Sequence, residues 1–482
     1  MKILLVMPSI DNGYWKKLGK DVGPRSEPLS LLYIATFLNH NGHKAEVLDC
    51  ETEGISDDEL RERIKNGGYD AFGVAMLTLA YGRAVMACKI AKEAAGPNIK
   101  VIVGGSHASV RPKETALENK DCIDVVTVGE AELTFLKLLD AFQGKCALKD
   151  IRGIAYVEDG AAVQTPDAEK VQDLDFFPIP DRDLINMKLY RPSVSYYKRL
   201  PAYTMITTRG CPYRCTFCAT AKTSYRMHSI PRVVEEMKLL VEKYGAKEIL
   251  LRDDTFTLNK KRTFELCDAL IAEGLHKKVK WDCITRAGLV DLDLLKKMKS
   301  AGCWGIHFGV EGGTQKLLNA INKDTTLDIV RQAFLWARQA GLETRGYFMI
   351  GLPGSAKEDD LATIEFAKEL DPDWAQFTIT TPYPGTELFK NAQEYGALTS
   401  SSATWDNYQT WGGFSETELP WVAHGRESEE LKELQRKALK EFYFRPQVLL
   451  RKITHIDNLP ILRKYFLGAL ALAAGGAGRQ PE

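Results

Sequence analysis

Short apolar runs alternate with amphipathic stretches along the first 145 residues, and this alternation is the feature that most constrains the fold. The runs have the length of buried strands, and the stretches between them have the apolar spacing of helices. The candidate strands are Lys2–Met7, Ala45–Leu48, Ala71–Met76, Val101–Val103 and Val125–Val128. Strands separated by helices are parallel and joined by right-handed crossovers. This part of the chain is therefore predicted to be a doubly wound parallel α/β sheet of about five strands.

A second strand–helix series begins near residue 200, after a predicted hairpin at residues 153–165 and a Pro-rich joint at residues 177–181. Its candidate strands are Tyr203–Thr207, Glu248–Arg252, Lys280–Thr285, Gly305–Val310, Thr344–Ile350 and Gln376–Thr380. These units are too few for a closed eight-unit barrel, so the pattern predicts a partial (βα)6 barrel of the TIM type. Functional residues of such barrels lie at the carboxyl ends of the strands.

The C-terminal stretch changes character and is predicted to be a mostly helical segment with a helix at Ser428–Tyr443. The tryptophan-rich stretch Trp405–Trp421 is a candidate lid, with core packing as the alternative for most of its rings. The apolar tail Leu467–Ala474 is too short to span a bilayer, and either covers the core or touches a lipid. We therefore predict four parts, with bounds 1–148, 149–198, 199–390 and 391–482.

Charge and cysteine content narrow the function classes. The 64 Lys and Arg residues balance 64 Asp and Glu residues, so the basic footprint of a nucleic-acid binder is absent and no nucleic-acid partner is expected. No run of about 20 apolar residues predicts a transmembrane segment, and the short first run does not match a signal peptide. A cytoplasmic protein is predicted, in which the ten cysteines are reduced thiols or metal ligands rather than disulfides.

Three cysteines, Cys211, Cys215 and Cys218, follow a predicted barrel strand with three and then two residues between them. Closely spaced thiolates can hold three corners of an iron–sulfur cube, and a fourth cysteine would close every iron. Three thiolates leave one iron with an open position, as catalytic metal sites require. A zinc site usually has paired C-x-x-C units, and this pairing is absent although His228 is available. The spacing therefore predicts a 4Fe–4S cluster.

The C-x3-C-x2-C loop on a partial barrel resembles the radical S-adenosylmethionine superfamily, over about residues 200–390. The resemblance implies that the open iron binds the amino and carboxylate groups of S-adenosylmethionine, which is cleaved to methionine and a 5′-deoxyadenosyl radical. Phe217, directly before the third cysteine, matches the family position that lies against the adenine. An electron donor such as flavodoxin or ferredoxin is implied as a partner.

The resemblance also implies further S-adenosylmethionine-binding residues. Asp253 and Asp254 end the second strand where relatives carry Gly-Gly-Glu for the methionine amino group, a departure that leaves the pairing open. Arg286 matches the basic residue for the carboxylate, Glu311 the acid for the ribose hydroxyls, and Gly351 the backbone beside the adenine. A zwitterion needs a carboxylate and a cation, and a diol needs an acceptor. The alternative for each residue is an ordinary loop-stabilising role.

The N-terminal sheet resembles the flavodoxin-like cobalamin-binding domain of a large radical S-adenosylmethionine subfamily. Glycines after strands let the backbone approach a large flat cofactor. The implied cobalamin residues are Leu29, Ser30, Thr78, Gly104, Gly105, His107, Gly129 and Glu130, with Thr127 as an alternative hydroxyl. The D-x-H-x-x-G motif of many corrinoid proteins is absent, so no histidine ligand to cobalt is expected. The alternative for His107 is a surface residue.

The implied function is a cobalamin-dependent methyltransferase that modifies an unactivated carbon of a small-molecule or lipid substrate, through the 5′-deoxyadenosyl radical and methylcobalamin. The alternatives are a radical cyclase or rearrangement enzyme of the porphyrin-cyclase or hopanoid-side-chain kind, and a non-enzymatic corrinoid sensor. A methylthiotransferase would need a second cluster, for which Cys50, Cys88 and Cys122 are dispersed candidates. Their positions favour buried small hydrophobic residues instead.

Overall fold

The structure is a computed structural model that describes residues 1–10, 25–409 and 417–454. The chain divides into two compact units, one within Met1–Asn12 and Glu27–Tyr190, the other within Gly13–Ser26 and Arg191–Glu482. Residues 410–416 of the predicted lid, and the apolar tail, lie outside the described residues. Within the described part of the chain, no helix is long and apolar enough to cross a membrane.

The first unit contains a seven-stranded sheet in the order β2-β1-β3-β4-β5-β6-β7. Its strands are β1 (Lys2–Met7), β2 (Lys44–Asp49), β3 (Ala71–Ala75), β4 (Lys100–Gly104), β5 (Val125–Thr127), β6 (Ile154–Glu158) and β7 (Ala161–Gln164). The first five pair in parallel, which confirms the doubly wound prediction. The predicted hairpin forms β6 and β7, which extend the sheet in antiparallel fashion.

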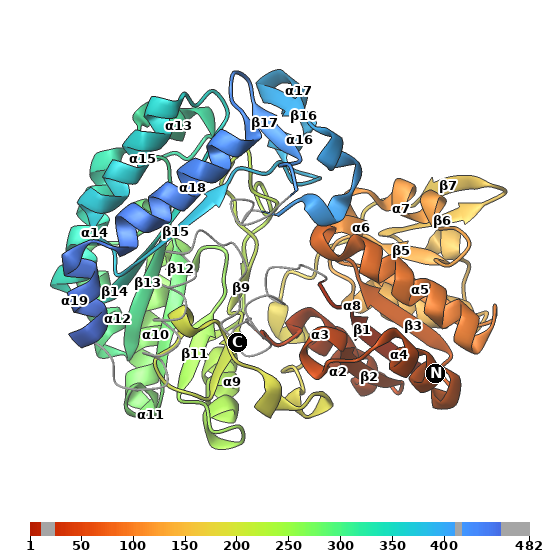
Figure 1. Cartoon of the computed structure of the whole chain (residues 1–482). Helices are drawn as coiled ribbons and strands as arrows, with labels where there is room; N and C mark the ends of the chain where they lie inside the picture. The colour runs from red at the N-terminus through yellow and green to blue at the C-terminus, as the bar shows by residue number, and fades with distance from the viewer. Residues whose placement is uncertain (11–24, 410–416, 455–482) are drawn as a thin grey trace, which may run out of the picture. The chain divides into compact units, whose positions relative to one another are not determined.

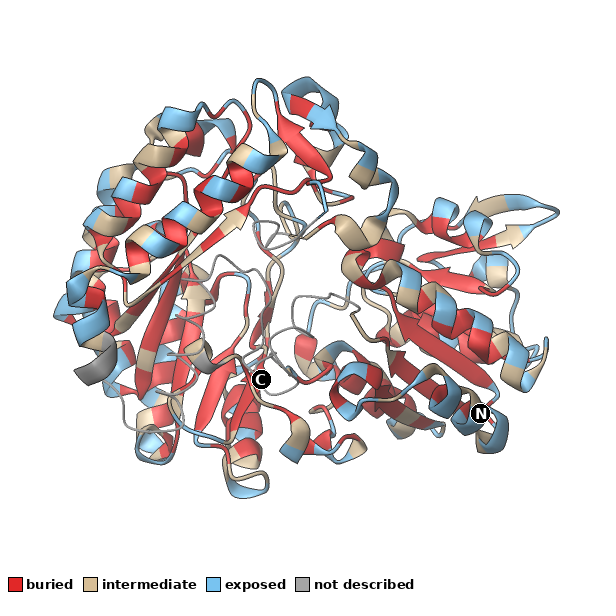
Figure 2. Cartoon of the chain, in the orientation of Figure 1, coloured by how far each residue is buried: buried red, intermediate tan, exposed pale blue. Residues whose placement is uncertain are grey.

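Helices follow each of the parallel strands of this unit (Figure 1). They are α2 (Leu29–His40), α3 (Cys50–Glu53), α4 (Asp57–Gly67), α5 (Tyr81–Ala95), α6 (Ser106–Val110), α7 (Pro112–Glu118) and α8 (Glu132–Phe142). Strands β1 and β3 are buried along almost their whole length because helices cover both faces of a doubly wound sheet (Figure 2). The loops that follow β3, β4 and β5 therefore gather at one edge of the sheet.

The second unit contains a six-stranded parallel sheet in the order β15-β14-β13-β12-β11-β8. Its strands are β8 (Ala202–Met205), β11 (Glu248–Leu251), β12 (Lys280–Thr285), β13 (Cys303–Glu311), β14 (Glu343–Ile350) and β15 (Trp374–Ile379). Spatial order follows chain order, as expected when each helix returns the chain to the next strand. The predicted partial barrel is confirmed.

Helices line the outer side of this sheet (Figure 1). They are α9 (Ile230–Glu242), α10 (Lys260–Ala272), α11 (Leu275–Lys278), α12 (Leu292–Ser300), α13 (Gln315–Ala320), α14 (Leu327–Gln339) and α15 (Lys357–Leu370). The sequence marks several of their starts. Ser229, Asp291 and Thr326 each accept a hydrogen bond from a backbone N–H of the first turn, which satisfies a donor that the helix leaves unpaired.

The C-terminal segment is helical, as predicted, but it packs directly on the barrel sheet. Its elements are α16 (Glu387–Lys390), α17 (Ala392–Tyr395), β16 (Gly396–Leu398), β17 (Trp421–Ala423), α18 (Ser428–Tyr443) and α19 (Pro446–Thr454). Phe442 of α18 lies 6.3 Å, centroid to centroid, from Phe377 of β15, which stacks on Phe348 of β14. Burial of each ring contributes about 1.5–3 kcal/mol, so α18 belongs to the barrel core.

Candidate functional site

The loop that carries Cys211, Cys215 and Cys218 is bracketed by the two-stranded ribbon β9 (Thr208–Arg209) and β10 (Arg226–Met227). Gly210 opens the loop with φ +91°, and a Cβ there would lie 2.2 Å from the carbonyl oxygen of Ser224. Only glycine fits this position without a rearrangement. Cys211 and Cys215 are buried and Cys218 is half-buried.

Each cysteine has one polar neighbour. The Sγ atom of Cys211 lies 3.5 Å from the hydroxyl of Thr255, and that of Cys218 lies 3.3 Å from the hydroxyl of Thr220. Arg286 donates a hydrogen bond from Nη1 to Cys215 Sγ at 3.2 Å. Burial raises the pKa of the Cys218 thiol, so a thiolate at this position needs a bound metal or a nearby cation.

The donor set fits an iron–sulfur cluster. In the described residues, no three His, Cys, Asp or Glu side chains are grouped closely enough to hold a single metal ion. A cubane accepts one thiolate at each of several irons, so its ligands need not converge on one point. A hydrogen bond to a ligand sulfur, as Arg286 provides at Cys215, is one of the means by which a protein adjusts the cluster potential.

Asp253 and Asp254 follow β11 but differ in surroundings. Asp253 is buried and accepts hydrogen bonds from the backbone N–H groups of Thr207 and Thr208 at 2.6 and 3.0 Å, and from the Thr207 hydroxyl at 2.6 Å. These contacts join the ends of β8 and β11. Asp254 is exposed and accepts from the hydroxyl of Thr220, the residue beside Cys218. Of the two predicted residues, Asp254 is the one that lies beside the cysteine loop.

Arg286 lies directly after β12, at the predicted strand end. Its guanidinium lies 3.8 Å from the ring centroid of Tyr213, and its Nη2 donates to the backbone carbonyl of Lys323. The structure thus brings this predicted cation to the cysteine loop, between an aromatic ring and a cluster ligand. Neither Tyr213 nor Lys323 was expected from the sequence.

Glu311 is the last residue of β13 and adopts φ +72°, which is unusual for a residue other than glycine. The strand register shifts between Gly309 and Glu311, a bulge of the kind found next to active sites. Its Oε1 accepts a hydrogen bond from Lys323 Nζ at 2.6 Å, and both side chains are buried. The predicted ribose acceptor is therefore held at a strand end by a buried cation.

The predicted adenine region contains Phe217 and Gly351. Phe217 is half-buried and packs on a cluster formed by Leu317, Ile321, Met349 and Leu352. Gly351 has φ +73°, and its N–H donates to Asp360 Oδ1 at 3.0 Å. The backbone N–H of Gly351 is therefore committed to the fold, while Phe217 lies near the carboxyl ends of β13 and β14. The hydrophobic platform for a flat ring is present.

In the first unit, Thr78, His107 and the glycines lie after β3, β4 and β5, at one edge of the sheet. His107 is buried in α6, and its Nδ1 lies 3.2 Å from the hydroxyl of Thr78. Burial and the nearby Arg111 lower the pKa of His107 to about 4, so the ring is neutral at pH 7. The alternative interpretation of His107 as a surface residue is wrong, because the short helix after β4 turns its ring inward.

The glycines of this edge have distinct roles. A Cβ at Gly104 would lie 2.5 Å from the hydroxyl of Thr127, and Gly105 has φ +104°, so both positions require glycine. Gly129 has φ +81° with open space around it, and its N–H donates to the Ser109 hydroxyl. Leu29 is half-buried and Ser30 exposed at the start of α2, which follows β1 at the same edge.

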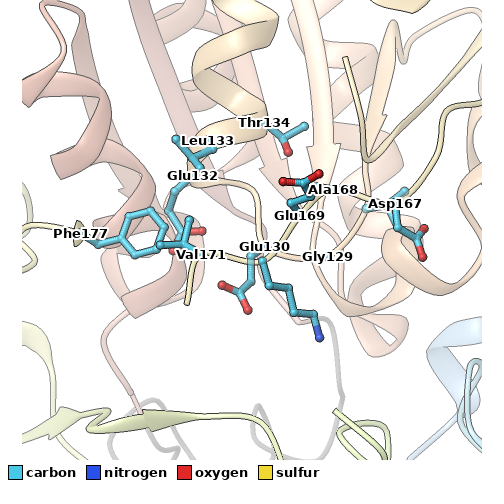
Figure 3. Close-up of a pocket in the computed structure, with 12 residues that line it drawn as sticks. Gly129, Glu130, Glu132, Leu133, Thr134, Asp167, Ala168, Glu169, Val171 and Phe177 are labelled. Atoms are coloured by element: carbon cyan, nitrogen blue, oxygen red, sulfur yellow. The ribbon is translucent and has the colours of Figure 1, made fainter. Parts of the chain in front are cut away.

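A cavity of about 180 Å³ opens beside Gly129 and Glu130. In Figure 3, Leu133, Val171 and Phe177 gather on one side of this cavity, and residues 167–169 on the other. Ligand pockets typically measure about 300–1,000 Å³, so the cavity fits a part of a corrinoid rather than the whole molecule. The open space at Gly129 and the glycine-lined edge fit a large flat cofactor.

Cys50, Cys88 and Cys122 do not form a second metal site. All three lie in the hydrophobic core of the first unit, among apolar side chains of the sheet and helices. Burial raises the pKa of Cys50 to about 12 and that of Cys88 well above its usual value. Thiols in such surroundings stay protonated, which supports their interpretation as small hydrophobic residues.

Comparison with known proteins agrees with both halves of the chain. The Radical SAM superfamily matches residues 205–367, and the B12 binding domain matches residues 15–139. An uncharacterized methyltransferase of Pyrococcus horikoshii is 36% identical over 456 residues, which cover 94% of this chain and 95% of that protein. The anaerobic magnesium-protoporphyrin IX monomethyl ester cyclase of Cereibacter sphaeroides is 30% identical over 82% of this chain and 64% of its own length.

Two solved structures share the fold. The radical S-adenosylmethionine methyltransferase TsrM from Kitasatospora setae, with tryptophan and a SAM analogue bound, has a TM-score of 0.71 at 18% identity and covers 92% of this chain and 89% of its own. The cobalamin-dependent radical enzyme OxsB, with aqua-cobalamin and S-adenosylmethionine bound, has a TM-score of 0.74 at 17% identity. It covers 98% of this chain and 71% of its own.

Proposed function

The chain belongs to the radical S-adenosylmethionine superfamily, among the enzymes that also carry a B12-binding domain, and from this premise we propose that it is a cobalamin-dependent methyltransferase. Its cofactors are a 4Fe–4S cluster, S-adenosylmethionine and cobalamin. The name of the Pyrococcus relative supports the reaction class. We propose an unactivated carbon of a small molecule or lipid as the acceptor, since no nucleic-acid footprint is present in the sequence.

One observation carries the proposal: three thiols, a guanidinium and a carboxylate converge at the carboxyl ends of barrel strands. Arg286 contacts Cys215, and Asp254 lies one hydroxyl away from Cys218. A cation and an anion beside the cluster ligands match the carboxylate and amino groups of S-adenosylmethionine. When bound, the cluster supplies the electron that cleaves S-adenosylmethionine, and cobalamin carries the methyl group.

The chain's own residues orient these groups. We propose that Glu311 accepts the ribose hydroxyls, that Phe217 packs on the adenine, and that the glycine-lined edge of the first unit holds cobalamin. Because His107 is neutral and turned toward Thr78, we propose a hydrogen-bonding role for it rather than a cobalt ligand. The corresponding parts would be residues 1–148 for cobalamin, 149–198 for the hairpin and the Pro-rich linker, 199–390 for the barrel and 391–482 for the cover.

The test begins with anaerobic reconstitution followed by iron, sulfide and cobalt analysis. We expect about four irons and one cobalt per chain. Incubation with reductant and S-adenosylmethionine should release both S-adenosylhomocysteine, from methyl transfer, and 5′-deoxyadenosine, from cleavage. A Cys215→Ala variant is the control and should form neither 5′-deoxyadenosine nor an intact cluster.

A second candidate function is oxidative ring closure or rearrangement, favoured by the likeness to the Cereibacter cyclase. Such an enzyme would form 5′-deoxyadenosine without S-adenosylhomocysteine, and S-adenosylmethionine with a deuterated methyl group would leave no label in the product. Release of labelled product separates the two. We also propose flavodoxin or ferredoxin as the electron donor and the cytoplasm as the compartment, which reduction assays with each purified donor would test.

A further inference from the structure

Lys323 is a buried cation in the turn that follows α13. Only 5% of its surface is exposed, although lysine is among the residues least often buried. The residues on either side, Asn322 and Asp324, both adopt φ +50°, a conformation that residues other than glycine rarely take. Non-glycine residues in this region persist where the surrounding structure holds them, and they cluster at functional sites. The turn is therefore shaped to put Lys323 inside.

The side chain and the main chain of Lys323 contact two different predicted S-adenosylmethionine ligands. Its Nζ donates to Glu311 Oε1 at 2.6 Å. Its carbonyl oxygen accepts a hydrogen bond from Arg286 Nη2, and Arg286 Nη1 donates to Cys215 Sγ. One residue thus joins the carboxylate at the end of β13 to the guanidinium at the end of β12, and through it to a cluster ligand.

The same turn is fixed to the cysteine loop by the main chain. The N–H of Thr216, next to Cys215, donates to the carbonyl of Ile321 at 3.1 Å. The strand below leaves room for the ion pair, because a Cβ at Gly309 would lie 2.5 Å from Glu311 Oε1 and 2.8 Å from Lys323 Nζ. Three independent contacts therefore set the position of Lys323.

We propose that Lys323 is a positioning residue for S-adenosylmethionine, which fixes the ribose acceptor Glu311 and the cluster-side cation Arg286 in one arrangement. The inference rests on the proposed function, since it assumes that S-adenosylmethionine binds at the cysteine loop. A carboxylate has about four acceptor directions, so Glu311 can hold Lys323 and still accept a hydroxyl. The buried ammonium holds the carboxylate in one orientation before the ligand arrives.

The experiment measures S-adenosylmethionine affinity of the cluster-reconstituted full chain by anaerobic equilibrium dialysis. The variants are Lys323→Met, Lys323→Arg, Glu311→Gln and the double variant of Lys323→Met with Glu311→Gln. Lys316→Met is the matched control, because Lys316 lies on neighbouring α13 and makes an exposed ion pair with Asp359. Iron content and the change in the electron paramagnetic resonance signal on adding S-adenosylmethionine are recorded for each.

We expect Lys323→Met to weaken binding about tenfold or more, which is what loss of one charge-assisted contact predicts. Lys323→Arg should restore most of the affinity, and Lys316→Met should match the wild type. The double variant should bind about as weakly as Glu311→Gln alone, since the two residues act through one contact. Binding of the 2′-deoxy analogue of S-adenosylmethionine should not depend on the Lys323 side chain, because that side chain supports the ribose contact.

Wild-type affinity in Lys323→Met, or fully additive losses in the double variant, would overturn the inference while the proposed function stands. If the wild-type protein holds its cluster but does not bind S-adenosylmethionine, the proposed function fails and the inference with it. Should Lys323→Met lose the cluster, Gly309→Ala decides. Its Cβ would lie closest to Glu311 Oε1 and Lys323 Nζ and must separate them. The variant should therefore weaken binding at unchanged iron content, and unchanged affinity would count against Lys323.

Discussion

Arg286 donates a hydrogen bond to the sulfur of Cys215 at 3.2 Å while its guanidinium lies over the ring of Tyr213. This relationship places a permanent positive charge against one predicted cluster ligand. A positive charge and a hydrogen bond both stabilise the more negative, reduced form of a cluster. We therefore expect this cation to favour reduction of the cluster and to attract the carboxylate of an incoming zwitterion.

Replacement of Arg286 by Met should make the cluster harder to reduce. A charge-assisted hydrogen bond is worth about 1.5–3 kcal/mol, and a difference of about 1.4 kcal/mol between the two oxidation states equals about 60 mV for one electron. We expect the midpoint potential of the cluster in Arg286→Met to fall by about 60 mV relative to the wild type. A redox titration monitored by electron paramagnetic resonance measures this shift.

Arg331→Gln is the matched control for this titration. Arg331 pairs with Asp328 and Glu369 on the exposed faces of helices, away from the cysteines. The midpoint potential of the cluster in Arg331→Gln should equal that of the wild type. An unchanged midpoint potential in Arg286→Met would show that the contact between Arg286 and Cys215 does not affect the cluster potential.

His107 should make the stability of the apoprotein depend on pH. Its pKa lies at about 4 in the folded chain, against an ordinary value of 6.5, chiefly because the ring is buried. The unfolded chain therefore binds more protons, so the free energy of unfolding falls as pH decreases from 6.5 toward 4. The largest loss expected from this one residue is about 3 kcal/mol.

Urea denaturation of the wild type and of His107→Gln between pH 4 and pH 7 measures this effect. Glutamine keeps a polar partner for Thr78 but does not titrate, so the variant should lose stability less steeply over this range. His424→Gln, at an exposed histidine, should keep the wild-type slope. If the free energy of unfolding falls with pH equally steeply in the wild type and in His107→Gln, His107 is not the source of the pH dependence.

The strands of both sheets could be predicted from the sequence because buried parallel strands are apolar runs between helical patterns. The cysteine loop could also be predicted, since the spacing of its three cysteines is a local feature of the sequence. The number of strands in the first sheet could not be predicted, because the hairpin Ile154–Gln164 joins β5 only through long-range pairing. Likewise, nothing in the local pattern shows that α18 packs on β15.

The sequence could not distinguish Asp253 from Asp254, since both end the same strand. Adjacent residues of an extended chain point in opposite directions, so one carboxylate turns into the fold and the other toward the cysteine loop. Lys323 was missed for a different reason. Lys323 does not follow a strand. It contacts Glu311 only because the turn after α13 brings the two side chains together, so no sequence spacing predicts this ion pair.

Variants at the two aspartates should therefore separate stability from binding. Asp253→Asn should destabilise the fold by about 1–3 kcal/mol, because it weakens the acceptor for two backbone N–H groups and the Thr207 hydroxyl. Asp254→Asn should leave the free energy of unfolding nearly unchanged but weaken S-adenosylmethionine binding about tenfold. Denaturation and equilibrium dialysis on both variants test this, and the opposite assignment of effects would exchange their roles.

Removal of the Asp282 carboxylate should destabilise the barrel strongly. It is fully buried on β12, accepts from Arg252 at 2.9 Å, and lies 3.2 Å from Nε2 of His307. Burial alone would raise its pKa, but Arg252 and His307 hold the pKa of Asp282 below its usual value. The carboxylate is thus ionised and balances the half-buried guanidinium of Arg252.

Asp282→Asn leaves the half-buried Arg252 charge without this anionic partner, so it should lower the free energy of unfolding by at most about 3–5 kcal/mol. Chemical denaturation of the apoprotein measures this loss. Asp268→Asn is the control, because Asp268 pairs with Lys297 at the surface and should change stability by at most about 1 kcal/mol. Arg252→Met combined with Asp282→Asn should recover part of the loss, because it removes the unbalanced charge. If Asp282→Asn lowers the free energy of unfolding no more than Asp268→Asn does, the Arg252–Asp282 ion pair does not stabilise the barrel more than a surface ion pair.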